Sequence, residues 1–327
     1  GATTIDTVHQ DIIETHILTR LDGPTLASAC CASSQLYTLA SQEQLWINIC
    51  HSTWPSTTTP RVLEIISKFP AHGPRSFFSA SFTSPDGAAV NSASAPAPPY
   101  QDCPSELISA VDIYYRENLV FSRVIETETV SDWFRCSPFR IDLLDPKDTV
   151  ATPIRHPDDE DTCRGLGEDL SLSWILIDPV GRRAMNLSSH LPVTVQRHWL
   201  TGEVHVRFAS LLTGRERMEI MECVILVTCG GNQAGEMHVR EVSLQVQDMD
   251  GVQWNGKDSL VILERGLEGK RGRWGRRDVE GKKRYVEFLE MKRERREKKL
   301  RSEGILDIFC LSFGVLIFAS LVLFILW

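Results

Sequence analysis

The C-terminal apolar segment constrains the fold of this chain more than any other feature. Ile308 to Trp327 contains no charged side chain and no proline. A bilayer core of about 30 Å needs about 20 helical residues, and this segment has that length. The alternative is a buried C-terminal helix, but a helix in a soluble core usually keeps a polar face. We therefore predict a transmembrane helix over residues 305–327.

The charges beside this segment predict its orientation. The basic segment 267–304 precedes it, and Lys270 to Arg301 alone holds 15 basic and 6 acidic residues. Positive residues stay on the cytosolic side of a membrane, so the part of the chain that precedes the apolar segment is expected in the cytosol. The chain is thus expected to be tail-anchored, with the endoplasmic reticulum as the expected membrane. The residues expected to contact the lipid bilayer are Ile308, Phe313, Val315, Leu316, Phe318, Leu321, Phe324 and Trp327.

The basic segment admits three interpretations. It is a solvated juxtamembrane helix that enforces topology, a helix attracted to anionic lipid headgroups, or a nuclear localisation signal that would give a nuclear pool. The whole chain carries a formal net charge of −8. This acidity argues against a nucleic-acid partner, so the basic segment needs a local explanation.

Residues 5–50 have the pattern of a small helical module. Capping boxes, in which two side chains bracket a helix start, are predicted at Thr7–Gln10 and Ser41–Gln44. The sequence Asp22-Gly23-Pro24 predicts the end of one helix and the start of the next. A unit of this size is too small to bury a generous core alone, so we expect it to pack against a partner.

The apolar positions of this module resemble an F-box. They are carried by Asp11 to Leu21, by Pro24 to Ala29 and by Leu45-Trp46, while Val8-His9 stands where the family usually has Leu-Pro. An unrelated helical bundle would share many of these positions. The resemblance implies binding to the Skp1 adaptor of a cullin–RING ubiquitin ligase. The residues that it assigns to Skp1 binding are Val8, Ile12, Ile13, Ile17, Leu18, Leu21, Pro24, Leu26 and Trp46.

The resemblance is closest to a small group of plant F-box proteins. It rests on Thr15 to Ala29, on Ser52 to Ser56 and on the C-terminal apolar anchor. One protein of that group is induced by cytokinin. The resemblance implies a substrate-receptor subunit of a Skp1–cullin–F-box (SCF) ubiquitin ligase, with a role in cytokinin response. Such a subunit is a non-catalytic adaptor, and its client is unknown.

The middle of the chain changes from helical to strand periodicity. Residues 51–82 are expected to extend the helical module, and the Ser-, Ala- and Pro-rich residues 83–101 to form a linker, so that the β-rich region 102–266 should fold independently. Its short alternating runs predict an antiparallel β-sandwich, which makes the fold class α+β. The predicted strands are Val111–Arg116, Leu119–Ile125, Phe139–Leu144, Leu172–Ile177, Val193–Trp199, Glu203–Phe208, Cys223–Thr228, Val242–Gln247 and Leu260–Leu263.

The sequence gives little support to catalysis. The nine cysteines include no C-x-x-C pair, which indicates reduced thiols rather than a zinc site. Gly165-Leu-Gly167 lacks the third glycine of a dinucleotide loop. We therefore expect no catalytic residue, no metal and no cofactor. Residues 156–162 are expected to form an exposed acidic loop, and Trp174, Trp199 and Trp254 to lie in the sandwich core.

Two functions remain open at this point. In the first, the helical module recruits Skp1, the β-rich region captures a protein client and the tail holds the ligase at a membrane. In the second, the chain is a membrane-anchored scaffold whose β-rich region binds a protein or a glycan without any ligase. Skp1 binding distinguishes the two.

Overall fold

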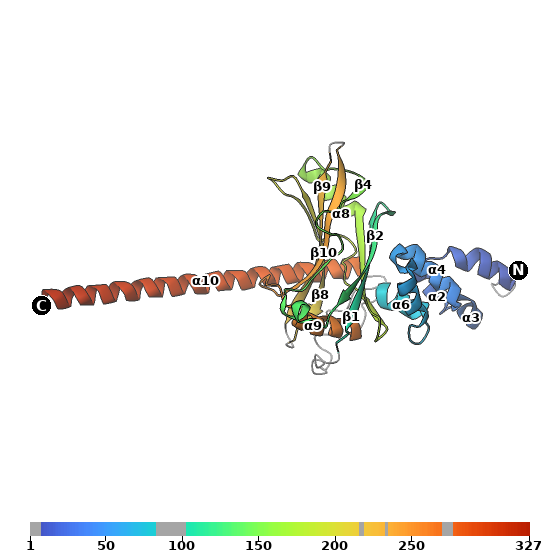
Figure 1. The fold of residues 1–327 in the computed structure, drawn as a ribbon, viewed down its shortest axis with the longest axis horizontal. Helices are drawn as coiled ribbons and strands as arrows, with labels where there is room; N and C mark the ends of the chain where they lie inside the picture. Colours follow the sequence, from blue (N-terminus) through green and yellow to red (C-terminus); the bar gives the residue numbers. More distant parts are fainter. Residues whose placement is uncertain (1–7, 83–102, 216–218, 233–234, 270–276) are drawn as a thin grey trace. The chain divides into compact units, whose positions relative to one another are not determined.

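The computed structural model describes residues 8–82, 103–215, 219–232, 235–269 and 277–327 (Figure 1). It combines helices with antiparallel sheets and ends in a long apolar helix, in agreement with the mixed fold class expected from the sequence. The chain divides into two compact units, Gly1–Gly281 and Lys282–Trp327. The expected linker 83–101 and the capping residue Thr7 lie outside the described residues.

The N-terminal part is helical, as the sequence predicts. Its elements are α1 (Gln10–Ile12), the π-helix η2 (Ile13–Ile17), the 3₁₀-helix η3 (Leu18–Arg20), α2 (Gly23–Ala29), α3 (Ser34–Ala40), α4 (Glu43–Thr53), the 3₁₀-helix η4 (Pro55–Thr58), α5 (Pro60–Ser67) and α6 (Pro74–Phe82). Asp22 caps α2 by accepting a hydrogen bond from the Thr25 amide at 2.9 Å. The capping box predicted at Ser41–Gln44 is wrong, because α4 begins after Gln42 without a side-chain cap.

The β-rich region forms two antiparallel sheets. Its elements are β1 (Glu106–Tyr115), β2 (Asn118–Glu128), α7 (Asp132–Cys136), β3 (Arg140–Asp142), β4 (Val150–Arg155), α8 (Glu160–Asp169), β5 (Leu170–Asp178), β6 (Arg183–Asn186), β7 (Thr194–Arg197), β8 (Val204–Thr213), β9 (Ile220–Gly231), β10 (Glu236–Gln247) and α9 (Gly256–Glu268). Among the described residues, one sheet has the order β2-β1-β5-β6. The other has the order β3-β10-β9-β8-β7, with β4 also paired to β10.

Strand β5 is buried along nearly its whole length because both of its faces are covered. Leu172 and Trp174 point into the core between the two sheets. Ile175 and Ile177 point the other way, into a core shared with the N-terminal helices. This alternation follows from the two-residue period of a strand, and double burial explains why the strand reads as an apolar run.

The N-terminal helices therefore pack directly on the sheet that contains β1 and β5. Figure 1 shows these helices, in blue, beside β1 and β2. Ile108 and Ala110 of β1 belong to the same buried cluster as Leu26 and Trp46 of the helices. One face of the sheet of residues 102–266 completes the helical core, which argues against independent folding of these residues.

A row of polar residues crosses the sheet beneath the helices. Ser122, Asp112 and Ser173 are cross-strand neighbours on β2, β1 and β5. Ser56 donates to both Asp112 carboxylate oxygens, from its amide at 3.0 Å and its hydroxyl at 2.5 Å. Trp54 Nε1 donates to Ser173 Oγ at 3.2 Å. These bonds fix the register between the helices and the sheet.

Helix α9 replaces the strand predicted at Leu260–Leu263, so that prediction is wrong. The Asn255 side chain caps the helix by accepting a hydrogen bond from the Asp258 amide at 2.8 Å. Leu260, Leu263 and Leu267 then fall on one helical face, and all three enter the core between the sheets. A run of four apolar residues fits a buried helix as well as a strand.

Several other elements differ from the sequence-based expectation. The acidic loop expected over 156–162 is shorter, because α8 begins at Glu160 and is capped by Asp159 and Thr162. Strands β4 and β6 and helix α7 were not predicted. Trp174 is buried and Trp254 packs against the same core, as expected, but Trp199 is exposed to solvent.

Helix α10 (Arg277–Leu326) contains the predicted membrane segment. Within Lys282–Leu326 this helix contains a stretch that is long enough and apolar enough to cross a membrane. The described side chains of the apolar part, including Ile308, Phe313 and Val315, are exposed rather than buried in protein. Cys30, Cys50, Cys163, Cys223 and Cys229 are buried free thiols.

Candidate functional site

The residues assigned to Skp1 binding separate into two groups. The first group forms part of the core of the helical module: Ile13, Leu18, Leu26 and Trp46. The second group keeps surface exposed to solvent: Val8, Ile12, Ile17, Leu21 and Pro24. Only the second group is available to a partner, and we call it the exposed apolar row. Leu26, which the resemblance assigns to Skp1 binding, is fully buried.

A π-helical turn aligns the two most exposed members of the row. The Leu18 amide donates to the carbonyl of Ile13, five residues earlier, as in a π-helix. Residues five apart therefore share a face here, whereas in a regular α-helix they diverge. Ile12 and Ile17 lie on the outside, with 48% and 40% of their surface exposed. The turn thus builds an apolar surface that helical periodicity alone does not give.

Two threonine hydroxyls bond backbone carbonyls at the π-turn. Thr15 Oγ1 donates to the Asp11 carbonyl at 2.5 Å, and Thr19 Oγ1 to the Thr15 carbonyl at 2.7 Å. Hydroxyls that bond the carbonyl four residues earlier compete with the backbone and bend helices. The signal was present in the sequence as Thr15 and Thr19, but it does not specify a π-turn.

Trp46 supports the module from inside. Its Nε1 donates to the Ala40 carbonyl at 2.8 Å, and its ring packs against Phe78 with centroids 5.4 Å apart. Phe78 also leaves no room at Gly23, where an added Cβ would lie 2.1 Å from the ring. The start of α2 therefore depends on α6, which lies beyond the 5–50 boundary predicted for the module.

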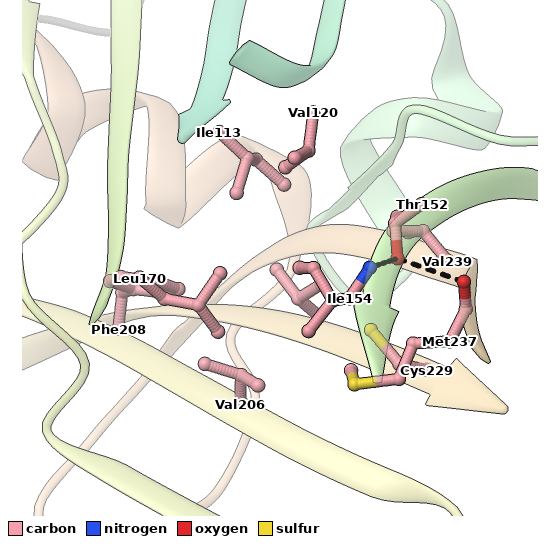
Figure 2. Close-up of a pocket in the computed structure, with 11 residues that line it drawn as sticks. Ile113, Val120, Thr152, Ile154, Leu170, Val206, Phe208, Cys229, Met237 and Val239 are labelled. Carbon is pink, nitrogen blue, oxygen red and sulfur yellow. Dashed lines mark hydrogen bonds between the residues drawn. The ribbon is translucent and has the colours of Figure 1, made fainter. Parts of the chain in front are cut away.

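A small cavity lies between the two sheets of the β-rich region (Figure 2). Its volume is about 20 Å³, enough for one water molecule but far below the ~300–1,000 Å³ of ligand pockets. Thr152 contributes a hydroxyl, which donates to the Met237 carbonyl at 2.8 Å and accepts from the Ile154 amide. The other lining residues shown in Figure 2 are apolar or, at Cys229, a thiol. We conclude that it is a packing void rather than a site for a client or a hormone.

The described residues offer little for bond-making chemistry. They contain no group of His, Cys, Asp and Glu side chains placed to hold a metal ion. Burial raises the pKa of Cys229 to about 12, so this thiol stays protonated.

Comparisons with known proteins place the chain among plant relatives. "Probable F-box protein At2g36090" of Arabidopsis thaliana is 54% identical over 326 residues, covering 99% of this chain and 94% of the relative. "F-box protein At2g27310" of the same plant is 44% identical over 336 residues, covering 98% and 96%. "F-box protein At3g44326" is 44% identical over 312 residues, covering 92% and 84%. No protein-family model and no solved structure matches the chain.

Proposed function

The chain belongs to the plant F-box protein family, and we propose that it is the substrate-receptor subunit of an SCF ubiquitin ligase tethered to a membrane. In this role it makes no bond itself. It binds a Skp1-like adaptor, and through it a cullin–RING ligase, and it holds a protein client near the ubiquitin-loaded enzyme. Proximity of this kind raises the effective concentration of the client.

The exposed apolar row is the surface we assign to the adaptor. Ile12 and Ile17 present apolar surface to solvent from a helix whose opposite side, at Ile13 and Leu18, is fixed in the core. Full burial of a Leu or Ile side chain contributes about 1.5–3 kcal/mol, and these two, which are about half exposed, each contribute part of that to a complex. This alignment is the single observation that carries the proposal.

The β-rich region is the part we assign to client capture. Because the N-terminal helices share a core with β1 and β5, the adaptor surface and the β-rich region move together. A client bound to the sheets is then held at a fixed position relative to the adaptor. Such rigidity favours transfer of ubiquitin to a restricted set of lysines.

The apolar end of α10 is the part we assign to membrane tethering. Residues 308–327 would span the bilayer, with the basic residues of α10 on the cytosolic side. We place the protein in the endoplasmic reticulum membrane. Cleavage between the basic segment and the anchor would let the basic segment act as a nuclear localisation signal and would give a nuclear pool. Its clients would include proteins that respond to cytokinin, a role supported by the family resemblance and tested by client abundance after hormone treatment.

Adaptor binding is tested by pulldown of a purified Skp1-like protein with the full chain in detergent. Ile12→Asp plus Ile17→Asp should weaken binding at least tenfold, because the two apolar anchors are replaced by charges. Val252→Asp is the matched control, since Val252 is exposed on a turn outside the helical module. Equal binding by the double variant and the control would rule out the assignment and favour the scaffold function.

A further inference from the structure

The turn between β7 and β8 presents two large apolar side chains to solvent. Trp199 is 87% exposed and Leu200 is 71% exposed. Exposed apolar side chains that lie together mark interaction sites, and Trp199 and Leu200 are neighbours in the chain. We call residues 198–203 the Trp199 turn.

The Trp199 turn is held in place by its own hydrogen bonds. The His198 amide donates to the Glu203 carbonyl at 2.7 Å, and the Gly202 amide donates back to the His198 carbonyl at 2.9 Å. The Thr201 amide donates to His198 Nδ1 at 3.1 Å. Gly202 has φ +71°, a conformation that glycine adopts without strain.

An ion pair joins the turn to the sheet. Glu203 accepts from Arg240 of β10 at 2.6 Å. Together with the backbone bonds, this pair presents Trp199 and Leu200 in a fixed arrangement. Preorganisation lowers the entropy lost on binding, so the turn is suited to act as an anchor.

A strongly acidic helix lies next to the turn. Arg197, two residues before Trp199, donates to the carbonyl of Asp158 at 3.4 Å, and Gly167 of α8 packs against Val195 of β7. Residues 158–169 contain six carboxylates and one arginine. Asp158, Asp161 and Asp169 pair with arginines, and Asp159 caps the helix. The exposed carboxylates of Glu160 and Glu168 add further negative charge to the helix beside the turn.

We infer that the Trp199 turn and the adjacent acidic helix α8 form the client-binding surface, and that the client is a protein with an apolar pocket bordered by basic side chains. This inference rests on the proposed receptor function and adds the surface and the chemistry of the partner. Tryptophan is enriched among the residues that dominate binding energy in interfaces. The carboxylates steer a basic client and disfavour an anionic lipid surface.

The test compares ubiquitin-modified peptides in plant cells that express the full chain or its variants. Clients are defined as proteins whose ubiquitination is lost with Ile12→Asp plus Ile17→Asp. Trp199→Ser plus Leu200→Ser should reduce ubiquitination of these clients at least tenfold. Val180→Ser plus Val252→Ser is the matched control, because both residues are exposed on other turns, and it should leave the clients unchanged. Equal thermal melting of the variants shows that each is folded.

Direct binding supplies the second measurement. An identified client is purified and titrated against the full chain in micelles. The Trp199 and Leu200 variant should weaken the Kd at least tenfold. Glu160→Gln plus Glu168→Gln should weaken it severalfold and reduce its salt dependence, since both carboxylates are exposed on α8.

The outcomes separate the inference from the function on which it rests. Clients whose ubiquitination requires Ile12 and Ile17 but does not require Trp199 and Leu200 would overturn the inference. The proposed receptor function would still hold in that case. If no client depends on Ile12 and Ile17, the receptor function fails, and the inference fails with it. Slower hydrogen exchange at residues 198–203 in phosphatidylcholine–phosphatidylserine nanodiscs without client would assign the turn to lipid. A smaller sedimenting mass of the Trp199 and Leu200 variant would assign it to contact between copies.

Discussion

Replacing Asp112 tests how the N-terminal helices are held on the sheet. The carboxylate is fully buried and accepts hydrogen bonds from the Ser56 amide, the Ser56 hydroxyl and the Ser122 hydroxyl, at 3.0, 2.5 and 2.6 Å. Asp112→Ala removes all three and leaves the Ser56 amide without this acceptor. A buried unsatisfied group costs about 1–3 kcal/mol, so we expect the free energy of unfolding to fall by about 2 kcal/mol. Asp112→Asn keeps an acceptor oxygen and should stay within about 1 kcal/mol of the wild type at pH 7.

The pH dependence of the same variants gives a sharper test. Burial raises the pKa of Asp112, and the hydrogen bonds from Ser122 and Ser56 lower it in part. The folded state therefore binds more protons than the unfolded state, and this contribution to stability falls as the pH rises. The fall begins near the unfolded pKa of about 3.9 and ends above the raised folded pKa. Asparagine does not titrate, so Asp112→Asn should gain stability relative to the wild type across this window.

The measurement is urea unfolding of the chain that ends at Asp307, at several pH values between about 4 and 7. The quantity to follow is the difference in unfolding free energy between Asp112→Asn and the wild type, because other carboxylates titrate in both proteins. A difference that stays flat over this range would refute the raised pKa. An Asp112→Ala protein as stable as the wild type would refute the role of the carboxylate in docking the helices.

Three further predictions concern the core, the sheet and the tail. Gly256→Ala should lower the melting temperature by several degrees, because its Cβ would lie 2.2 Å from the Phe134 carbonyl oxygen and the backbone must shift; an unchanged melting curve would contradict this packing. Residues 102–266 expressed alone should aggregate or melt without cooperativity, since their sheet would expose its helix-facing apolar residues; a sharp, reversible thermal transition would argue against the shared core. Val315→Arg plus Leu316→Arg should make the full chain extractable by carbonate, at about 2.5–3.5 kcal/mol per charge at the centre of the span; retention in the membrane pellet would exclude this segment as the anchor.

The sequence by itself determined those features that depend on local pattern. The strands at Val111–Arg116 and Glu203–Phe208 were predicted because residues that alternate between two faces give a period of two. Asp22-Gly23-Pro24 predicted a helix boundary because capping needs particular residue types within one turn. Residues 308–327 carry no charged side chain, and this composition predicts an apolar helix independently of how the rest of the chain folds.

Features that depend on the packing or the solvent exposure of a segment were decided only by the tertiary structure. Leu260–Leu263 forms a helix because three leucines fill space between two sheets, and a run of four apolar residues does not specify that space. Trp199 was expected in the core because tryptophan is usually buried, yet a hairpin turn places it in solvent. In both cases the residue type was compatible with either outcome, and the tertiary structure selected one.

The candidate adaptor surface shows the same division within a single helix. Its apolar content could be read from the sequence, since Ile12, Ile13, Ile17 and Leu18 are all apolar. Which of them lie inside depends on a π-turn that shifts the phase of the helix. Local sequence therefore determines that a segment is apolar and helical, whereas the division between core and surface is settled only when the segment packs, because burial is a property of the whole fold.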